Sequence, residues 1–131
     1  MNNYQIFNLY NEIEGYGYFS NAPLSKADLG RKLSTSRPSI KRFETVVYTL
    51  IPEFKSDYPE LPKEEWLKQK SKYNRKACLS PYQIWVISLY KKALELLGNT
   101  KAVEGFARNN PYLFTRKKYC SELQKLAQLS A

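Results

Sequence analysis

Four hydrogen-bonding side chains stand close together in the sequence: Arg37, Ser39, Lys41 and Arg42. They alternate with apolar residues whose spacing predicts the inward face of a helix, namely Ile40, Phe43, Val46 and Val47. The four polar side chains are then left on the outside. Arginine and lysine donate to guanine in the major groove of DNA, and serine can contact several base edges. We therefore expect Arg37, Ser39, Lys41 and Arg42 to contact DNA bases, with arginine best suited to a bidentate contact.

Two short helices joined by a tight turn would position these side chains. Ser25 is a good N-cap, and Ala27, Leu29 and Leu33 follow at spacings that share one helix face. The segment 34–36 then interrupts the pattern. Ser36 can cap a second helix, whose first turn tolerates Pro38. We predict this helix pair over residues 25–50, with the second helix ending before Pro52.

The segment 25–48 resembles the prokaryotic helix-turn-helix family. The family usually has a small residue in its first helix, where Gly30 stands here, and two inward apolar residues on its second helix, matched by Ile40 and Phe43. Ser34 departs from the pattern, because this turn position is commonly glycine. Either Ser34 accepts an unusual backbone angle or the turn is built differently. The alternative interpretation is a helical hairpin in a core, whose basic face is merely solvated.

A basic run follows at residues 68–76, with five positive charges and no acidic residue. Such a run favours contact with DNA phosphates without selecting any base. This run would be the wing of a winged helix or the basic end of a helix that continues from Trp66. An ordinary solvated linker is the alternative. We expect Trp66 and Leu67 to face inward. The predicted phosphate-contacting residues are Lys32, Lys68, Lys70, Lys72, Arg75 and Lys76.

Composition favours a polyanionic partner over catalysis. The chain has 131 residues and a formal net charge of +9 with no histidine, so the commonest general base and histidine-based metal sites are missing. No glycine-rich phosphate loop is present, and no acidic residues pair closely in an apolar context, so we expect no enzyme activity, no metal and no cofactor. Cys78 and Cys120 lack the spacing of a zinc or redox motif, and we predict reduced thiols in the core.

Ser80 and Pro81 mark the clearest helix start, and the helix should run to about Leu97 with Gly98 as its stop. Residues 81–97 are apolar around most of the circumference, which predicts burial on more than one side. Either a partner subunit covers this helix in a homodimer, or the N-terminal aromatic residues do. The order of elements up to this helix is similar to the layout of MerR and excisionase-type winged-helix proteins.

Both ends of the chain are predicted to be helical. Ile6, Leu9, Tyr10 and Ile13 have helical spacing, and the tyrosines nearby would either pack on the core or stack on bases. Residues 101–109 and about 114–129 predict two further helices, which would form either a packing hairpin or a second DNA-binding element.

The combined prediction is a mainly α fold: a helix-turn-helix, winged or not, packed with a C-terminal helical bundle. It forms a single compact domain over residues 1–131, with the helix-turn-helix at 25–50, a loop and basic run at 55–78, and a helical part at 80–131. We expect a cytoplasmic protein, because no signal peptide or membrane span is evident, that binds double-stranded DNA as a transcriptional regulator or recombination accessory factor. The alternative is a protein-interaction adaptor that docks through the aromatic N-terminus and the 81–97 helix.

Overall fold

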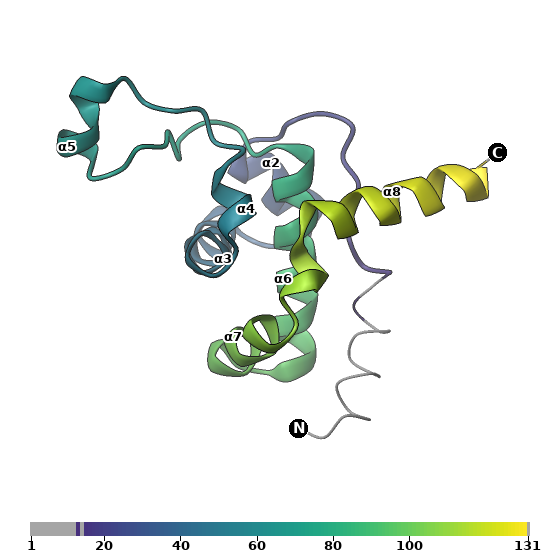
Figure 1. The fold of residues 1–131 in the computed structure, drawn as a ribbon. Helices are drawn as coiled ribbons and strands as arrows, with labels where there is room; N and C mark the ends of the chain where they lie inside the picture. Colours follow the sequence, from purple (N-terminus) through teal and green to yellow (C-terminus); the bar gives the residue numbers. More distant parts are fainter. Residues whose placement is uncertain (1–12, 14, 131) are drawn as a thin grey trace.

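A computed structural model describes residue 13 and residues 15–130, and these residues form a mainly helical protein without a β-strand (Figure 1). The predicted mainly α fold is therefore confirmed. The N-terminal helix expected from Ile6, Leu9 and Tyr10 lies outside the described residues, although Ile13 is helical and fully buried. The elements are α2 (Lys26–Lys32), α3 (Arg37–Leu50), α4 (Pro52–Lys55), η1 (Lys63–Glu65), α5 (Trp66–Gln69), α6 (Pro81–Leu97), α7 (Thr100–Asn109), η2 (Pro111–Phe114) and α8 (Arg116–Ser130).

Helices α2 and α3 begin at the predicted serine caps. The Ser25 hydroxyl accepts a hydrogen bond from the Asp28 amide at 3.1 Å, and the Ser36 hydroxyl accepts one from the Ser39 amide at 3.2 Å. Helix α3 ends at Leu50, ahead of Pro52 as expected. Inward contacts come from Ile40, Phe43 and Val47, all of which are buried.

The turn between α2 and α3 combines a left-handed serine with a close approach at Gly30. Ser34 has a φ of 56°, so it accepts the unusual backbone angle that glycine adopts freely. The Thr35 amide donates to the Gly30 carbonyl at 2.8 Å. A Cβ atom on Gly30 would lie 2.9 Å from the Thr35 carbonyl oxygen, which is too close. The small residue is thus required by the backbone of the turn.

The segment 59–76, called the arm below, leaves the helical body after α4 and returns to it before α6 (Figure 1). Two extended pieces run antiparallel and share two hydrogen bonds, Leu61 amide to Lys72 carbonyl and Asn74 amide to Pro59 carbonyl, both at 2.8 Å. The short helix α5 lies at the far end of the arm. It stops at Lys70, which has a left-handed φ of 53°, so the basic run does not continue as a helix.

Helix α6 is the centre of the core, and it begins at Ser80–Pro81 and ends at Gly98, as predicted. Ser80 and Gln83 form a reciprocal capping box, and the Gln83 side chain also donates to the Phe54 carbonyl at 2.9 Å. All residues from 82 to 90 are buried by the chain itself. Contacts from α3, α4, α7 and α8 cover the helix.

The segment before α2 also covers α6, as one of the two interpretations expected. The Tyr18 amide donates to the Ser88 hydroxyl at 2.8 Å, and Gly17 packs directly on the Trp85 ring. Only Glu95 and Leu96 are exposed along α6. Leu96 is the only exposed apolar side chain along α6, so the expected homodimer through residues 81–97 stays a prediction.

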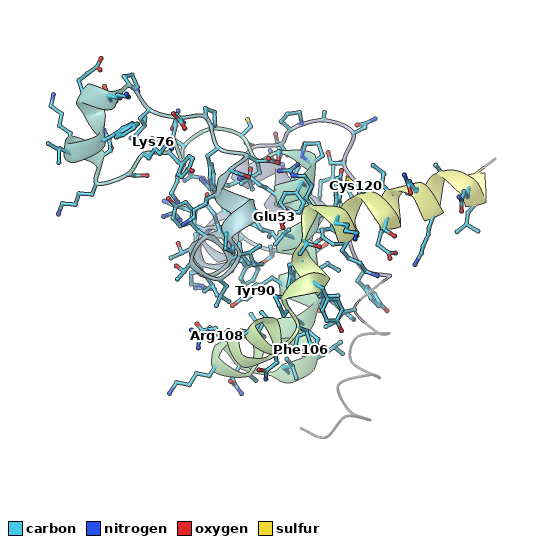
Figure 2. All side chains as sticks on the ribbon, viewed as in Figure 1. Glu53, Lys76, Tyr90, Phe106, Arg108 and Cys120 are labelled. Carbon is cyan, nitrogen blue, oxygen red and sulfur yellow. The ribbon has the colours of Figure 1, made fainter. Side chains whose placement is uncertain are left out.

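The C-terminal region contains α7, η2 and α8, close to the predicted bounds. Asn99 caps α7, and its side chain accepts a hydrogen bond from the Ala102 amide at 2.8 Å. Helix α8 packs on the core through Tyr119 at its start and then extends away from the body (Figures 1 and 2). Cys78 and Cys120 are free and exposed, so the prediction that they lie in the core is wrong. No helix within the described residues is long and apolar enough to cross a membrane.

Candidate nucleic-acid interface

A basic hollow of about 580 Å³ lies between α2, the first half of α3 and the returning piece of the arm. Its basic lining comes from three separate parts of the sequence: Lys26 from α2, Arg37 and Lys41 from α3, and Arg75 and Lys76 from the arm. Figure 2 shows Lys76 near the point where the arm rejoins the body. The fold therefore gathers positive charge that the sequence carries in two distant runs.

A buried carboxylate, Glu44, joins the three parts of this hollow. Glu44 is only 2% exposed, and its oxygens lie 3.2 Å from the Lys26 ammonium and 3.6 Å from the Arg75 guanidinium. The Tyr58 hydroxyl, at the base of the arm, donates to the same carboxylate. Burial and this carboxylate together hold the pKa of Tyr58 well above its usual range, so the phenol stays protonated and keeps donating.

Arg75 is held in place by several groups besides Glu44. Its guanidinium stacks 4.4 Å from the centre of the Tyr48 ring, and it donates to the Thr45 hydroxyl at 3.3 Å. The Lys26 ammonium donates to the Arg75 carbonyl. The phosphate contact of Arg75 stays a prediction, whereas its contacts with Glu44, Tyr48 and Thr45 fix the arm against α3. Charged contacts from Lys26 of α2 and Glu44 of α3 consequently position the arm relative to α3.

The four predicted base-contacting residues are split between two sides of α3. Arg37 and Lys41 are exposed and line the basic hollow. Arg42 is also exposed, but it lines a neighbouring hollow of about 560 Å³ between α3, α6 and α7, which Lys41 borders too. The Ser39 hydroxyl bonds to Ser36 and accepts from the Arg42 guanidinium, both at 3.0 Å. Ser39 thus positions the start of α3 and the Arg42 side chain.

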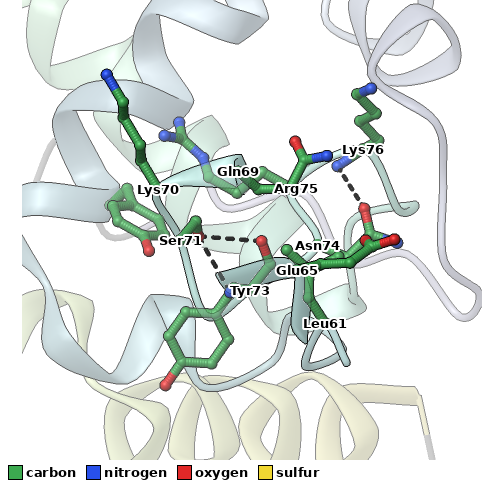
Figure 3. Close-up of a pocket in the computed structure, with 10 residues that line it drawn as sticks. Leu61, Glu65, Gln69, Lys70, Ser71, Tyr73, Asn74, Arg75 and Lys76 are labelled. Atoms are coloured by element: carbon green, nitrogen blue, oxygen red, sulfur yellow. Dashed lines mark hydrogen bonds between the residues drawn. The ribbon is translucent and has the colours of Figure 1, made fainter. Parts of the chain in front are cut away.

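The predicted phosphate-contacting residues occupy several settings. Lys32 is exposed at the end of α2, and Lys68 and Lys70 are exposed at the far end of the arm. Lys72 pairs with Glu60 at 3.1 Å, and that hydrogen bond raises the pKa of the Lys72 ammonium. Lys70, Arg75 and Lys76 also border a second hollow of about 440 Å³ on the arm (Figure 3).

Sequence reasoning missed Lys26 and Glu44. Glu44 stands four residues after Ile40 and three before Val47, so helical spacing places it on the buried face of α3. An acidic residue in that register needs a partner, and this was an available signal. Lys26 gives no such signal, because only the fold brings it beneath the arm.

Comparison of the chain with family models, with curated proteins and with solved structures found no match. Among the described residues, no group of histidine, cysteine, aspartate and glutamate side chains could hold a metal ion. Helix α3 thus lies beside a basic hollow and a projecting basic arm. These features suit electrostatic contact with an extended polyanion.

Proposed function

We propose that this protein binds double-stranded DNA in a sequence-specific manner, as a transcriptional regulator or a recombination accessory factor. In this proposal α2 and α3 act as a helix-turn-helix, and α3 lies in the major groove. The arm takes the place of a wing and follows the neighbouring phosphates. The observation that carries the proposal is the basic hollow, in which Arg37 and Lys41 of α3 lie beside Lys76 of the arm.

The geometry supports a division of labour between α3 and the arm. Arg37 and Lys41 are on the first turns of α3, the part of a recognition helix that usually contacts base edges. Arg42 is a further candidate on the adjoining face. Lys76, Lys68 and Lys70 are exposed outside α3 and would neutralise phosphates. Specificity is then expected from α3, and affinity at low salt from the arm.

The protein-interaction adaptor is the competing proposal, and it has less surface available. It requires the 81–97 helix and the aromatic N-terminus to dock on a partner. Residues 82–90 of α6 are buried, and among the described N-terminal aromatic residues Tyr18 and Phe19 pack against the core while Tyr16 is exposed. In this alternative, the exposed basic side chains on α3 would contact an acidic surface of the partner protein.

Selection of bound sequences from a random duplex pool tests the proposal. We expect a preferred site of definite sequence, bound with an affinity that falls steeply as salt increases. An Arg37→Ala or Lys41→Ala variant should lose preference at particular base pairs. Weak binding without any enriched sequence would contradict the proposal and favour the adaptor.

A further inference from the structure

Leu67, at the far end of the arm, is 92% exposed, although the sequence predicted that it faces inward. It is the most exposed of the large apolar side chains in the described part of the chain. Figure 1 shows α5, which carries Leu67, projecting well away from the helical body. A single exposed leucine is common on protein surfaces, so its setting decides whether it has a role.

The end of the arm is built to hold Leu67 outward. Its neighbour Trp66 folds back, and the indole N–H donates to the Leu61 carbonyl at 2.8 Å. The Lys72 ammonium lies 5.9 Å from the centre of the Trp66 ring, and the Ser71 amide donates to the Trp66 carbonyl at 3.1 Å. Because Trp66 occupies the side of α5 that faces the arm, the next residue, Leu67, points to solvent.

The surroundings of Leu67 are mainly basic. Lys63, Lys68 and Lys70 are all exposed within four residues of it. Two acidic residues precede it: Glu64 is exposed, whereas Glu65 is half-buried and lines the hollow shown in Figure 3. Leu67 is an apolar side chain that projects among lysines, on a protrusion beside the proposed DNA-binding helix α3. This setting resembles that of an apolar side chain that intercalates into DNA. Minor-groove proteins insert such side chains between base pairs and kink the duplex.

We propose that Leu67 inserts between two base pairs of the bound duplex from the minor groove and bends the DNA. This inference rests on the proposed function and adds a deformation to it. Lys63, Lys68 and Lys70 hold the phosphates on either side of the insertion. Sequence preference then extends beyond the bases that α3 contacts, because flexible pyrimidine–purine steps kink most easily.

The test uses the full chain and a selected duplex labelled at its two ends with a donor and an acceptor dye. Wild-type protein should bend the duplex by about 20 to 90°. Leu67→Ala should abolish most of the bend. It should also weaken binding about tenfold or more, because the variant buries less apolar surface when it binds the duplex. The slope of affinity against salt should stay the same, since no charge changes.

Leu129→Ala is the matched control, because Leu129 is 85% exposed on α8 and far from the arm in sequence. It should leave the bend and the affinity unchanged, and both variants should keep the wild-type unfolding midpoint. A duplex that is bound but stays straight, or that Leu67→Ala still bends, overturns the proposed insertion and leaves the proposed function standing. Absence of duplex binding, with the arm captured by anionic lipid vesicles, overturns both.

Discussion

Replacing Glu44 by glutamine removes the carboxylate that joins α2, α3 and the arm while keeping the shape of the side chain. Lys26 and Arg75, whose side chains are 10% and 34% exposed, would lose their ion-pair partner. Breaking a buried pair from one side costs about 3–5 kcal/mol. Glutamine still accepts from Tyr58, and Lys26 keeps its bond to the Arg75 carbonyl. We therefore expect the lower end, a loss of about 3 kcal/mol in the free energy of unfolding.

Urea denaturation followed by circular dichroism measures this loss. Glu60→Gln is the matched control, because Glu60 pairs with Lys72 on the surface of the arm, where the two side chains are 58% and 46% exposed. A surface pair of this kind contributes at most about 1 kcal/mol. Hydrogen exchange at the Asn74 amide, which bonds the arm to itself, should also accelerate more in Glu44→Gln.

If Glu44→Gln lowers the free energy of unfolding no more than Glu60→Gln does, the contacts of Lys26 and Arg75 with Glu44 do not hold the arm against α3. A loss of stability with unchanged exchange in the arm would show that the carboxylate supports only the core.

Three further results are expected. Gly30→Ala should destabilise the protein by about 1–2 kcal/mol, because its Cβ would meet the turn, whereas Gly105→Ala, with open space around it, should stabilise α7 by about 0.5–1 kcal/mol; chemical denaturation compares the two. Ser34→Gly should raise the unfolding midpoint, because it relieves a left-handed serine. Burial raises the pKa of Tyr58 and Tyr82 in the folded state, so the unfolded chain loses these protons first. Stability should hold below pH 10 and fall above it by about 1.4 kcal/mol per pH unit per tyrosine, and Tyr82→Phe should reduce that slope in a pH series.

Local signals in the sequence predicted the helices because each end has its own chemical marker. Three helices begin where a serine hydroxyl accepts a hydrogen bond from a first-turn amide, at Ser25, Ser36 and Ser80. Helix α6 ends at Gly98, which has a left-handed φ of 85°. The main failure was Leu67. An apolar residue after a helix start predicts burial, but α5 lies on a projecting arm, where only Trp66 finds a surface to cover.

The candidate site was predicted in part. Helical spacing correctly left Arg37, Lys41 and Arg42 exposed. It could not show that Arg37 and Lys41 share a hollow with the arm while Arg42 borders another, because that depends on where a distant segment packs. The role of Arg75 in fixing the arm could not be predicted either, since it depends on Glu44 and Tyr48 of α3, which are distant in sequence.

The most direct test of the proposed function is a salt titration of binding to the selected duplex and to a scrambled one, with Arg37→Ala and Lys76→Ala. Arg37→Ala should lower the preference for the selected duplex by about 1–3 kcal/mol and leave binding to the scrambled duplex almost unchanged. Lys76→Ala should weaken both duplexes alike and reduce the salt slope by about 0.9. Equal effects of the two variants on both duplexes, or no effect of either, would contradict the proposal that α3 selects bases beside an arm that holds phosphates.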